Sequence, residues 1–221
     1  MVGSGDELCG VSAWAGARCS FYPRGRHLYD DETAAVDLFR VIEGKVRVER
    51  RAPDGRMVPA TVFGPDDVFG VERLFTSGPH NECAVAMVDT RVACLDGARL
   101  QSLLRADPSV SEDLLRTLSR RVRRVSDHIV DLMSANVSAR LARVLLDSAQ
   151  QFGVHCDGGL RFALDLTQGQ LAQLVGTSRE SLNKALGDFA DSGWIHVSGD
   201  VVDIVDALSL SGHVDGARRL R

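Results

Sequence analysis

The amino-acid sequence predicts an α+β fold: an N-terminal β-roll of the jelly-roll type, then one long helix, then a C-terminal winged helix-turn-helix. Short β-like segments separated by turn residues fill residues 19–96, where no helical period persists. A seven-residue apolar repeat follows, and after it come two short helices joined by a glycine and a β-rich hairpin. We therefore expect three parts, at residues 1–106, 107–136 and 137–221.

Composition narrows the class of protein. The chain has 221 residues, of which 44% are hydrophobic and 25% charged, which suits a folded protein of two domains. No apolar run approaches the roughly 18 to 20 residues of a membrane span, and the first residues lack a basic segment followed by an apolar one, so we expect a cytoplasmic protein. The cysteines are odd in number, widely spaced and without a Cys-x-x-Cys pair, which predicts neither a disulfide framework nor a zinc site. They are Cys9, Cys19, Cys83, Cys94 and Cys156.

Turn residues divide the first part into strands. Residues 38–42 and 45–49 are β-rich and flank Glu43 and Gly44, so we expect them to form a hairpin. Further turns are marked by Pro53-Asp54-Gly55 and by Gly64-Pro65-Asp66-Asp67. The remaining expected strands are residues 57–63, 83–88 and 91–95. Many short strands at regular spacing are typical of a jelly roll or a small barrel.

A long helix is expected to open at Asp107-Pro108-Ser109, with proline tolerated near its first turn. Apolar residues then alternate in steps of three and four for nearly three heptads, which favours a partner helix. They are Leu115, Leu118, Val122, Val125, Ile129 and Leu132. A helix packed only on its own β-domain would show a wider apolar face, so we expect a parallel homodimer. A break at residues 134–136 precedes another amphipathic helix, residues 137–151, and forms a natural hinge.

Two helix starts lie close together in residues 166–186. Thr167 and Gln170 have the Thr-x-x-Gln spacing of a capping box, and Thr177 and Glu180 repeat it as Thr-x-x-Glu. Two amphipathic core helices joined by a loop are the alternative interpretation, but the paired caps favour a helix-turn-helix, an element that reads DNA.

The residues around these two starts support the same motif. Gly176 can turn the chain, and Ala172 is small where two helices would cross. The apolar seam consists of Leu171, Leu174, Val175, Leu182 and Leu186. Residues 194–197 and 201–205 then form two β-rich runs around Ser198-Gly199-Asp200, which predicts the hairpin of a wing.

The net charge of −4 is the main argument from composition against nucleic acid as a partner, because neutralising phosphates normally requires a basic face. Positive charge is nevertheless concentrated locally, with Arg179 and Lys184 at the second helix of the motif. The long helix carries Arg116, Arg120, Arg121, Arg123 and Arg124. We expect modest DNA affinity with a strong salt dependence.

The order of these parts, together with VGTSRESLNKAL at the second helix, resembles the cyclic-AMP receptor protein and fumarate-nitrate reduction regulator (CRP/FNR) family of bacterial transcription factors, in its actinobacterial form. The resemblance extends from about Cys19 and is most specific in residues 166–197. It implies a cyclic-nucleotide-binding type of β-roll and a homodimer that binds double-stranded DNA at a palindrome close to TGTGA-N6-TCACA, with RNA polymerase as a further partner. The motifs Gly-x-Ser-x-Gly, His-Glu-x-x-His and the P-loop are lacking, so we expect no enzyme.

The resemblance assigns the DNA-reading residues. Arg179 matches the arginine that pairs with guanine O6 and N7, Glu180 the glutamate that accepts from a cytosine amino group, and Lys184 a second basic reader that is usually arginine. Residues at the family's phosphate contacts are Gln168, Ser178 and Ser181. The alternative roles are a capping-box residue for Glu180 and a solvated surface charge for Lys184.

The resemblance also locates an effector pocket, which departs from the family's pattern. Family members hold the ribose of cyclic AMP with a glycine and a glutamate in Gly-Glu-Leu-x-Leu-Phe. Here Gly70 is retained, Val71 stands at the glutamate position, and Glu72 comes one place later. In a strand, a shift of one residue would turn Glu72 to the other face.

Two further contact points of the pocket also differ. The phosphate-binding Arg-Ser pair matches the segment of Asn81, Glu82 and Cys83, where Glu82 replaces the guanidinium and would repel a phosphate. The Thr-Ser pair that reaches the adenine becomes Val125 and Ser126. We therefore expect no confident cofactor: cyclic AMP should bind weakly or without consequence.

The β-roll could instead sense a signal other than a cyclic nucleotide. A redox switch at Cys83 or another exposed thiol is the main alternative. The iron–sulfur branch of the family fits badly, because Cys9 and Cys19 alone cannot ligate a cluster. The haem branch would need an axial ligand that cannot be assigned among His27, His80 and Cys83.

Overall fold

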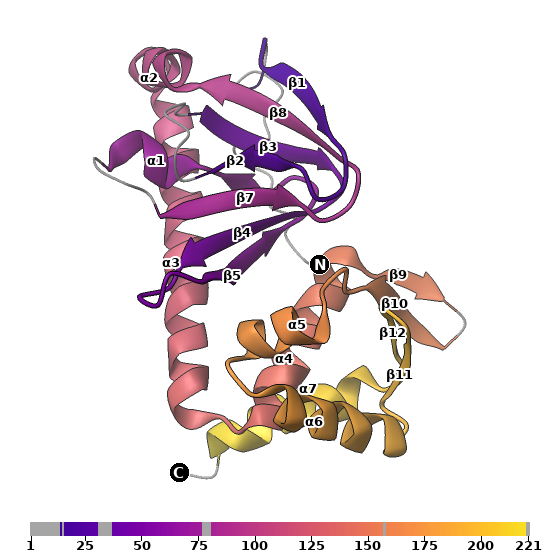
Figure 1. The fold of residues 1–221 in the computed structure, drawn as a ribbon. Helices are drawn as coiled ribbons and strands as arrows, with labels where there is room; N and C mark the ends of the chain where they lie inside the picture. The colour runs from indigo at the N-terminus through magenta and orange to yellow at the C-terminus, as the bar shows by residue number, and fades with distance from the viewer. Residues whose placement is uncertain (1–13, 15, 31–36, 77–80, 157, 220–221) are drawn as a thin grey trace. The chain divides into compact units, whose positions relative to one another are not determined.

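The chain divides into two compact units, Met1–Arg124 and Val125–Arg221, in a computed structural model that describes residues 14, 16–30, 37–76, 81–156 and 158–219 (Figure 1). The long helix α3 (Pro108–Ser134) runs through the boundary. Among the helices of these residues, none is long and apolar enough to cross a membrane.

Two four-stranded antiparallel sheets build the first unit, in the orders β1-β8-β3-β6 and β2-β7-β4-β5 (Figure 1). Their strands are β1 (Arg18–Tyr22), β2 (His27–Tyr29), β3 (Asp37–Glu43), β4 (Val46–Arg51), β5 (Met57–Phe63), β6 (Val68–Phe69), β7 (Glu82–Ala86) and β8 (Thr90–Asp96). Between the sheets lie the rings of Tyr29, Phe39, Phe63 and Phe69, in contacts with centroids 5.1 to 6.4 Å apart. This arrangement confirms the predicted jelly roll.

The hairpin predicted around Gly44 is wrong. β3 pairs with β8 and β6, whereas β4 pairs with β5 and β7, so the chain passes from one sheet to the other at Gly44. Gly44 has φ of +95°, and a Cβ there would lie 2.6 Å from the carbonyl oxygen of Asp89. Alternation along a strand identifies the strand but leaves its neighbours open, which is why two successive strands looked like a hairpin.

Replacing Gly44 with alanine is expected to destabilise the first unit strongly. A left-handed conformation costs a non-glycine residue about 1 to 2 kcal/mol, and the clash with the Asp89 carbonyl adds about 1 to 3 kcal/mol. Gly55→Ala is the matched control, because Gly55 has φ of +84° and open space around its Cβ position. Urea unfolding measures the stability of both variants, and equal losses of stability for Gly44→Ala and Gly55→Ala would contradict the close packing at Gly44.

Three helices cover the outer face of the β1-β8-β3-β6 sheet: α1 (Val71–Phe75), α2 (Gly97–Ala106) and the start of α3. The strands contribute Leu38 and Leu95 to this second core. The helices contribute Val71, Leu100, Val110 and Leu114. α2 is capped by Asp96, whose carboxylate accepts from the amide of Arg99 at 2.9 Å. Neither α1 nor α2 was predicted, because both are short.

The long helix begins at Pro108, within the predicted opening at Asp107-Pro108-Ser109. Its apolar stripe is exposed within the single chain: the relative exposure is 63% for Leu115, 65% for Val122, 52% for Val125 and 51% for Ile129. Leu118 is half-buried and Leu132 is exposed. The predicted break is confirmed, since α4 (Val137–Phe152) starts after Asn136, whose Oδ1 accepts from the amide of Ala139 at 2.8 Å.

The second unit contains the predicted winged helix-turn-helix (Figure 1). Its elements after α4 are β9 (Val154–Cys156), β10 (Gly159–Ala163), α5 (Gln168–Val175), α6 (Arg179–Asp191), β11 (Ile195–Ser198), β12 (Val201–Ile204) and α7 (Ala207–Arg219). The predicted wing hairpin β11–β12 is confirmed. β10 and β9 extend it to a four-stranded sheet. Neither this larger sheet nor α7 was predicted from the sequence. The core includes Leu141, Leu145, Leu171, Val175, Leu182, Phe189 and Ile204.

Candidate nucleic-acid interface

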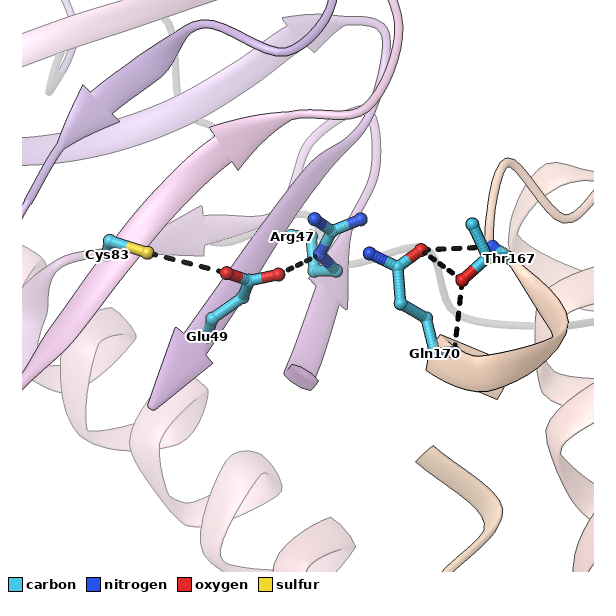
Figure 2. A network of polar contacts seen from close by, with 5 residues as sticks. All are labelled: Arg47, Glu49, Cys83, Thr167 and Gln170. Carbon is cyan, nitrogen blue, oxygen red and sulfur yellow. Dashed lines mark hydrogen bonds and ion pairs between the residues drawn. The ribbon is translucent and has the colours of Figure 1, made fainter. Parts of the chain in front are cut away.

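The first helix of the motif, α5, starts with the predicted capping box. The Thr167 hydroxyl accepts from the amide of Gln170 at 3.2 Å, and the Gln170 side-chain oxygen accepts from the amide of Thr167 at 3.0 Å (Figure 2). Gly176 ends the helix with φ of +72° and ψ of +48°, a left-handed conformation that suits glycine. The amide of Thr177 then returns to the carbonyl oxygen of Ala172 at 2.9 Å, which keeps the turn tight.

The second predicted capping box is wrong. The N-cap of α6 is Ser178 and not Thr177: the Ser178 hydroxyl accepts from the amide of Ser181 at 3.2 Å. The sequence offers two neighbouring hydroxyl residues, and the turn places the second at the cap. Glu180 therefore has no place in a capping box, which removes the alternative role considered for it.

α6 turns its apolar residues to the core and its polar residues to solvent. Leu182, Ala185 and Phe189 are buried. Arg179 and Glu180 in the first turn are exposed, as is Lys184 one turn later on the opposite side from the buried residues. The reading residues assigned from the sequence thus share an exposed helix face.

The starts of α5 and α6 lie side by side. A Cβ at Gly169, the second residue of α5, would lie 2.5 Å from Nη2 of Arg179, so the guanidinium rests against a glycine. Gln168 precedes that glycine and is exposed, like Ser178 and Ser181, whose hydroxyls are 3.1 Å apart. Two helix N-termini with exposed hydroxyls and an arginine form a surface that suits phosphate. Sequence reasoning missed Gly169, although a glycine inside a helix signals close approach by another group.

The effector-pocket segment at Gly70 is helical, so the argument from strand register is wrong. Gly70 has φ of +89° and precedes α1. On this helix Val71 is buried in the outer core, whereas Glu72 makes an ion pair of 2.5 Å with Arg121 of α3. The Arg121 guanidinium also lies 5.2 Å from the ring centroid of Phe63.

Glu82 occupies the inside of the roll and is 3% exposed. Its carboxylate accepts from the Tyr29 hydroxyl at 3.2 Å and pairs with Arg50 at 3.3 Å. Burial and the neighbouring Glu82 carboxylate raise the pKa of Tyr29 well above its usual value. The Arg73 guanidinium stacks 4.5 Å from the centroid of the Tyr29 ring, which links α1 to β7 through Tyr29.

Cys83 is buried, contrary to the expectation of an exposed thiol. Its Sγ lies 3.7 Å from an oxygen of Glu49, which in turn pairs with Arg47 at 2.7 Å (Figure 2). A buried thiol beside a carboxylate is disfavoured as a thiolate, the reactive form. Cys19 and Cys156 are the exposed cysteines of the described residues. Val125 and Ser126 lie on the exposed part of α3 that belongs to the second unit.

No group of three or more His, Cys, Asp and Glu in the described ranges could hold a metal ion. His80 and Cys9, which entered the haem and iron–sulfur interpretations, lie outside those ranges.

A β-roll followed by a long helix and a winged helix-turn-helix defines the class of DNA-binding regulators with a sensor domain. Residues 20–107 match the cyclic nucleotide-binding domain family, and residues 139–211 match the Crp-like helix-turn-helix domain family. The chain belongs to the CRP/FNR family of transcription regulators.

Two relatives show this membership. The chain is 43% identical over 190 residues to the CRP-like cAMP-activated global transcriptional regulator of Mycobacterium tuberculosis H37Rv, and the match covers 86% of this chain and 85% of that protein. It is 30% identical over 190 residues to the cyclic AMP receptor protein of Thermus thermophilus, covering 86% and 84%.

Solved structures share the fold. A CRP-family transcriptional regulator from Thermus thermophilus has a TM-score of 0.73 at 28% identity, covering 89% of this chain and 96% of that one. FixK2 from Bradyrhizobium japonicum has a TM-score of 0.76 at 24% identity, with the same coverage.

Proposed function

We propose that this protein is a homodimer that reads a TGTGA-type palindrome and regulates transcription with RNA polymerase as partner in the cytoplasm. The observation that carries the proposal is the exposed face of α6, where Arg179, Glu180 and Lys184 point away from the core. An arginine fork and a carboxylate at the start of a recognition helix match guanine and cytosine edges in the major groove.

The dimer is inferred from α3. Its heptad stripe leaves four large apolar side chains more than half exposed along one helix face, at Leu115, Val122, Val125 and Ile129. A second copy of the same helix covers such a stripe in register, with each apolar residue against its symmetry mate. Two α6 helices related by a two-fold axis then read the two halves of a palindrome.

The β-roll is proposed to respond weakly or not at all to cyclic AMP, although the two relatives above are named for activation by, or reception of, that nucleotide. Two observations support this. The Glu82 carboxylate sits inside the roll in contact with Tyr29 and Arg50, and a nearby phosphate would be repelled. Val71 is buried in the outer core, and Glu72 forms an ion pair with Arg121, so neither side chain is available to a ribose hydroxyl.

Saturating cyclic AMP is expected to tighten operator binding by less than about tenfold, because a ligand shifts an equilibrium only by its difference in affinity for the two states. The measurement is the affinity for one palindromic operator with and without the nucleotide, under reducing conditions and at fixed salt. The Mycobacterium tuberculosis relative serves as positive control. Tightening of tenfold or more, about 1.4 kcal/mol of coupling, would show an intact sensor.

The variant Glu82→Gln separates the effect of the Glu82 charge on cyclic AMP affinity from the effect of its side-chain size. This variant keeps the size of the side chain and removes the negative charge, so cyclic AMP should bind more tightly in calorimetry than to the wild type. Unchanged affinity would mean that the carboxylate does not face the nucleotide phosphate. A thiol input through Cys83 is not favoured, since that sulfur is buried.

A further inference from the structure

The side chain of Arg140, in the first turn of α4, joins the break after α3 to the turn of the helix-turn-helix. Its guanidinium donates three hydrogen bonds to backbone carbonyl oxygens. Nη1 donates to Ala135 at 2.7 Å, Nε to Val175 at 2.9 Å and Nη2 to Gly176 at 3.1 Å. Val175 and Gly176 end α5, where carbonyl groups lack helical partners and carry the negative end of the helix dipole. A guanidinium there satisfies them with charge-assisted bonds.

The last turn of α3 is held to the same place by two further contacts. A Cβ at Gly176 would lie 2.6 Å from Cδ2 of Leu132, so the leucine packs against the bare glycine of the turn. Asp131, which is 4% exposed, forms an ion pair of 2.5 Å with Nε of Arg143 on α4. All these residues belong to the second unit. The break between α3 and α4, where the sequence predicted a natural hinge, is therefore braced by these contacts.

We propose that Arg140 is a positioning residue that sets the direction of the recognition helix relative to the dimer helix, and thereby the operator spacing that the dimer prefers. α6 starts at Arg179, three residues after Gly176. The Arg140 guanidinium, which binds the carbonyl oxygens of both Gly176 and Ala135, therefore also holds the start of α6 to the end of α3. In a dimer joined through α3, this direction determines the separation of the two α6 helices. The inference rests on the proposed function.

The brace is tested with Arg140→Met, which keeps the apolar stem and removes all three donors, and with Arg140→Lys, which keeps the charge but not the planar fork. Arg161→Met is the matched control: Arg161 lies in the same unit and makes a bidentate pair with Asp203, at 2.6 and 2.9 Å. Each variant is titrated by fluorescence anisotropy against a single half-site and against palindromes with spacers of five, six and seven base pairs.

Arg140→Met is expected to lose about tenfold or more in affinity for the preferred palindrome, about 1.4 kcal/mol, but less than about threefold for the half-site. Its preference among the three spacers should also flatten. Arg140→Lys should fall between it and the wild type, and Arg161→Met should keep the wild-type preference. A wild-type spacer preference in both Arg140 variants, or equal losses on half-site and palindrome, would overturn the inference.

Hydrogen exchange of the DNA-free protein separates failure of this inference from failure of the proposed function. Amides of residues 132–140 should exchange faster in the Arg140 variants than in the wild type and in Arg161→Met, because opening of the break no longer breaks three hydrogen bonds. Unchanged exchange would refute the brace whatever DNA the protein reads. Faster exchange in a protein without a palindrome preference would refute the proposed function and the role in spacing.

Discussion

Arg179→Ala is expected to abolish selectivity for a TGTGA-type palindrome while leaving weak, salt-sensitive binding. A bidentate contact from a guanidinium to guanine O6 and N7 contributes about 1 to 3 kcal/mol of discrimination, and a dimer makes it twice. The residual binding comes from phosphate contacts, for which Gln168, Ser178 and Ser181 remain exposed at the two helix starts. This residual binding should weaken linearly on a logarithmic salt scale.

A binding-site selection experiment with wild-type and variant protein measures the change directly. Arg179→Lys is the informative companion, because it keeps the positive charge and loses the planar fork. It should retain more non-specific affinity than Arg179→Ala and little more selectivity. Wild-type sequence preference in Arg179→Ala would mean that another helix reads the bases.

Val122→Asp is expected to convert the dimer to monomers that bind the full palindrome poorly. Val122 is 65% exposed in the single chain, so the substitution leaves the protomer fold intact. Across a two-fold seam the aspartate would meet its own symmetry mate, and burying two like charges costs several kcal/mol. Binding to a single half-site should change little.

Light scattering gives the mass of the assembly in solution. Arg123→Asp places the same side chain one residue further along α3, on an exposed position outside the apolar stripe, and should remain dimeric. An unchanged dimer mass for Val122→Asp would show that the subunits meet elsewhere.

Local patterns in the sequence predicted most of the elements, whereas contacts between distant residues were out of reach. The cap at Thr167, the turn at Gly176 and the start at Pro108 depend on neighbouring residues and were predicted correctly. The hairpin around Gly44 was wrong because strand partners in a jelly roll lie far apart in sequence. The cap at Ser178 was missed by one residue, because Thr177 and Ser178 both carry hydroxyls.

The candidate sites show the same division. The exposed face of α6 follows from helical spacing alone. In contrast, Glu82 was predicted to place a charge in the pocket, but its partner Tyr29 is 53 residues away in the chain. No role for Arg140 was predicted from the sequence. Its acceptors at Val175 and Gly176 are 35 and 36 residues away, and they are backbone carbonyl oxygens, which every residue carries.

The pairing of β1 with β8 determines the order in which the newly made chain can fold. Arg18 pairs with Cys94, so the roll cannot close until almost the whole first unit has been synthesised. Pairing between strands so far apart in the sequence forms slowly. During translation the apolar stripe of α3 emerges after the last strand of the roll, so in the proposed dimer the two chains would meet through helices that follow an already complete roll.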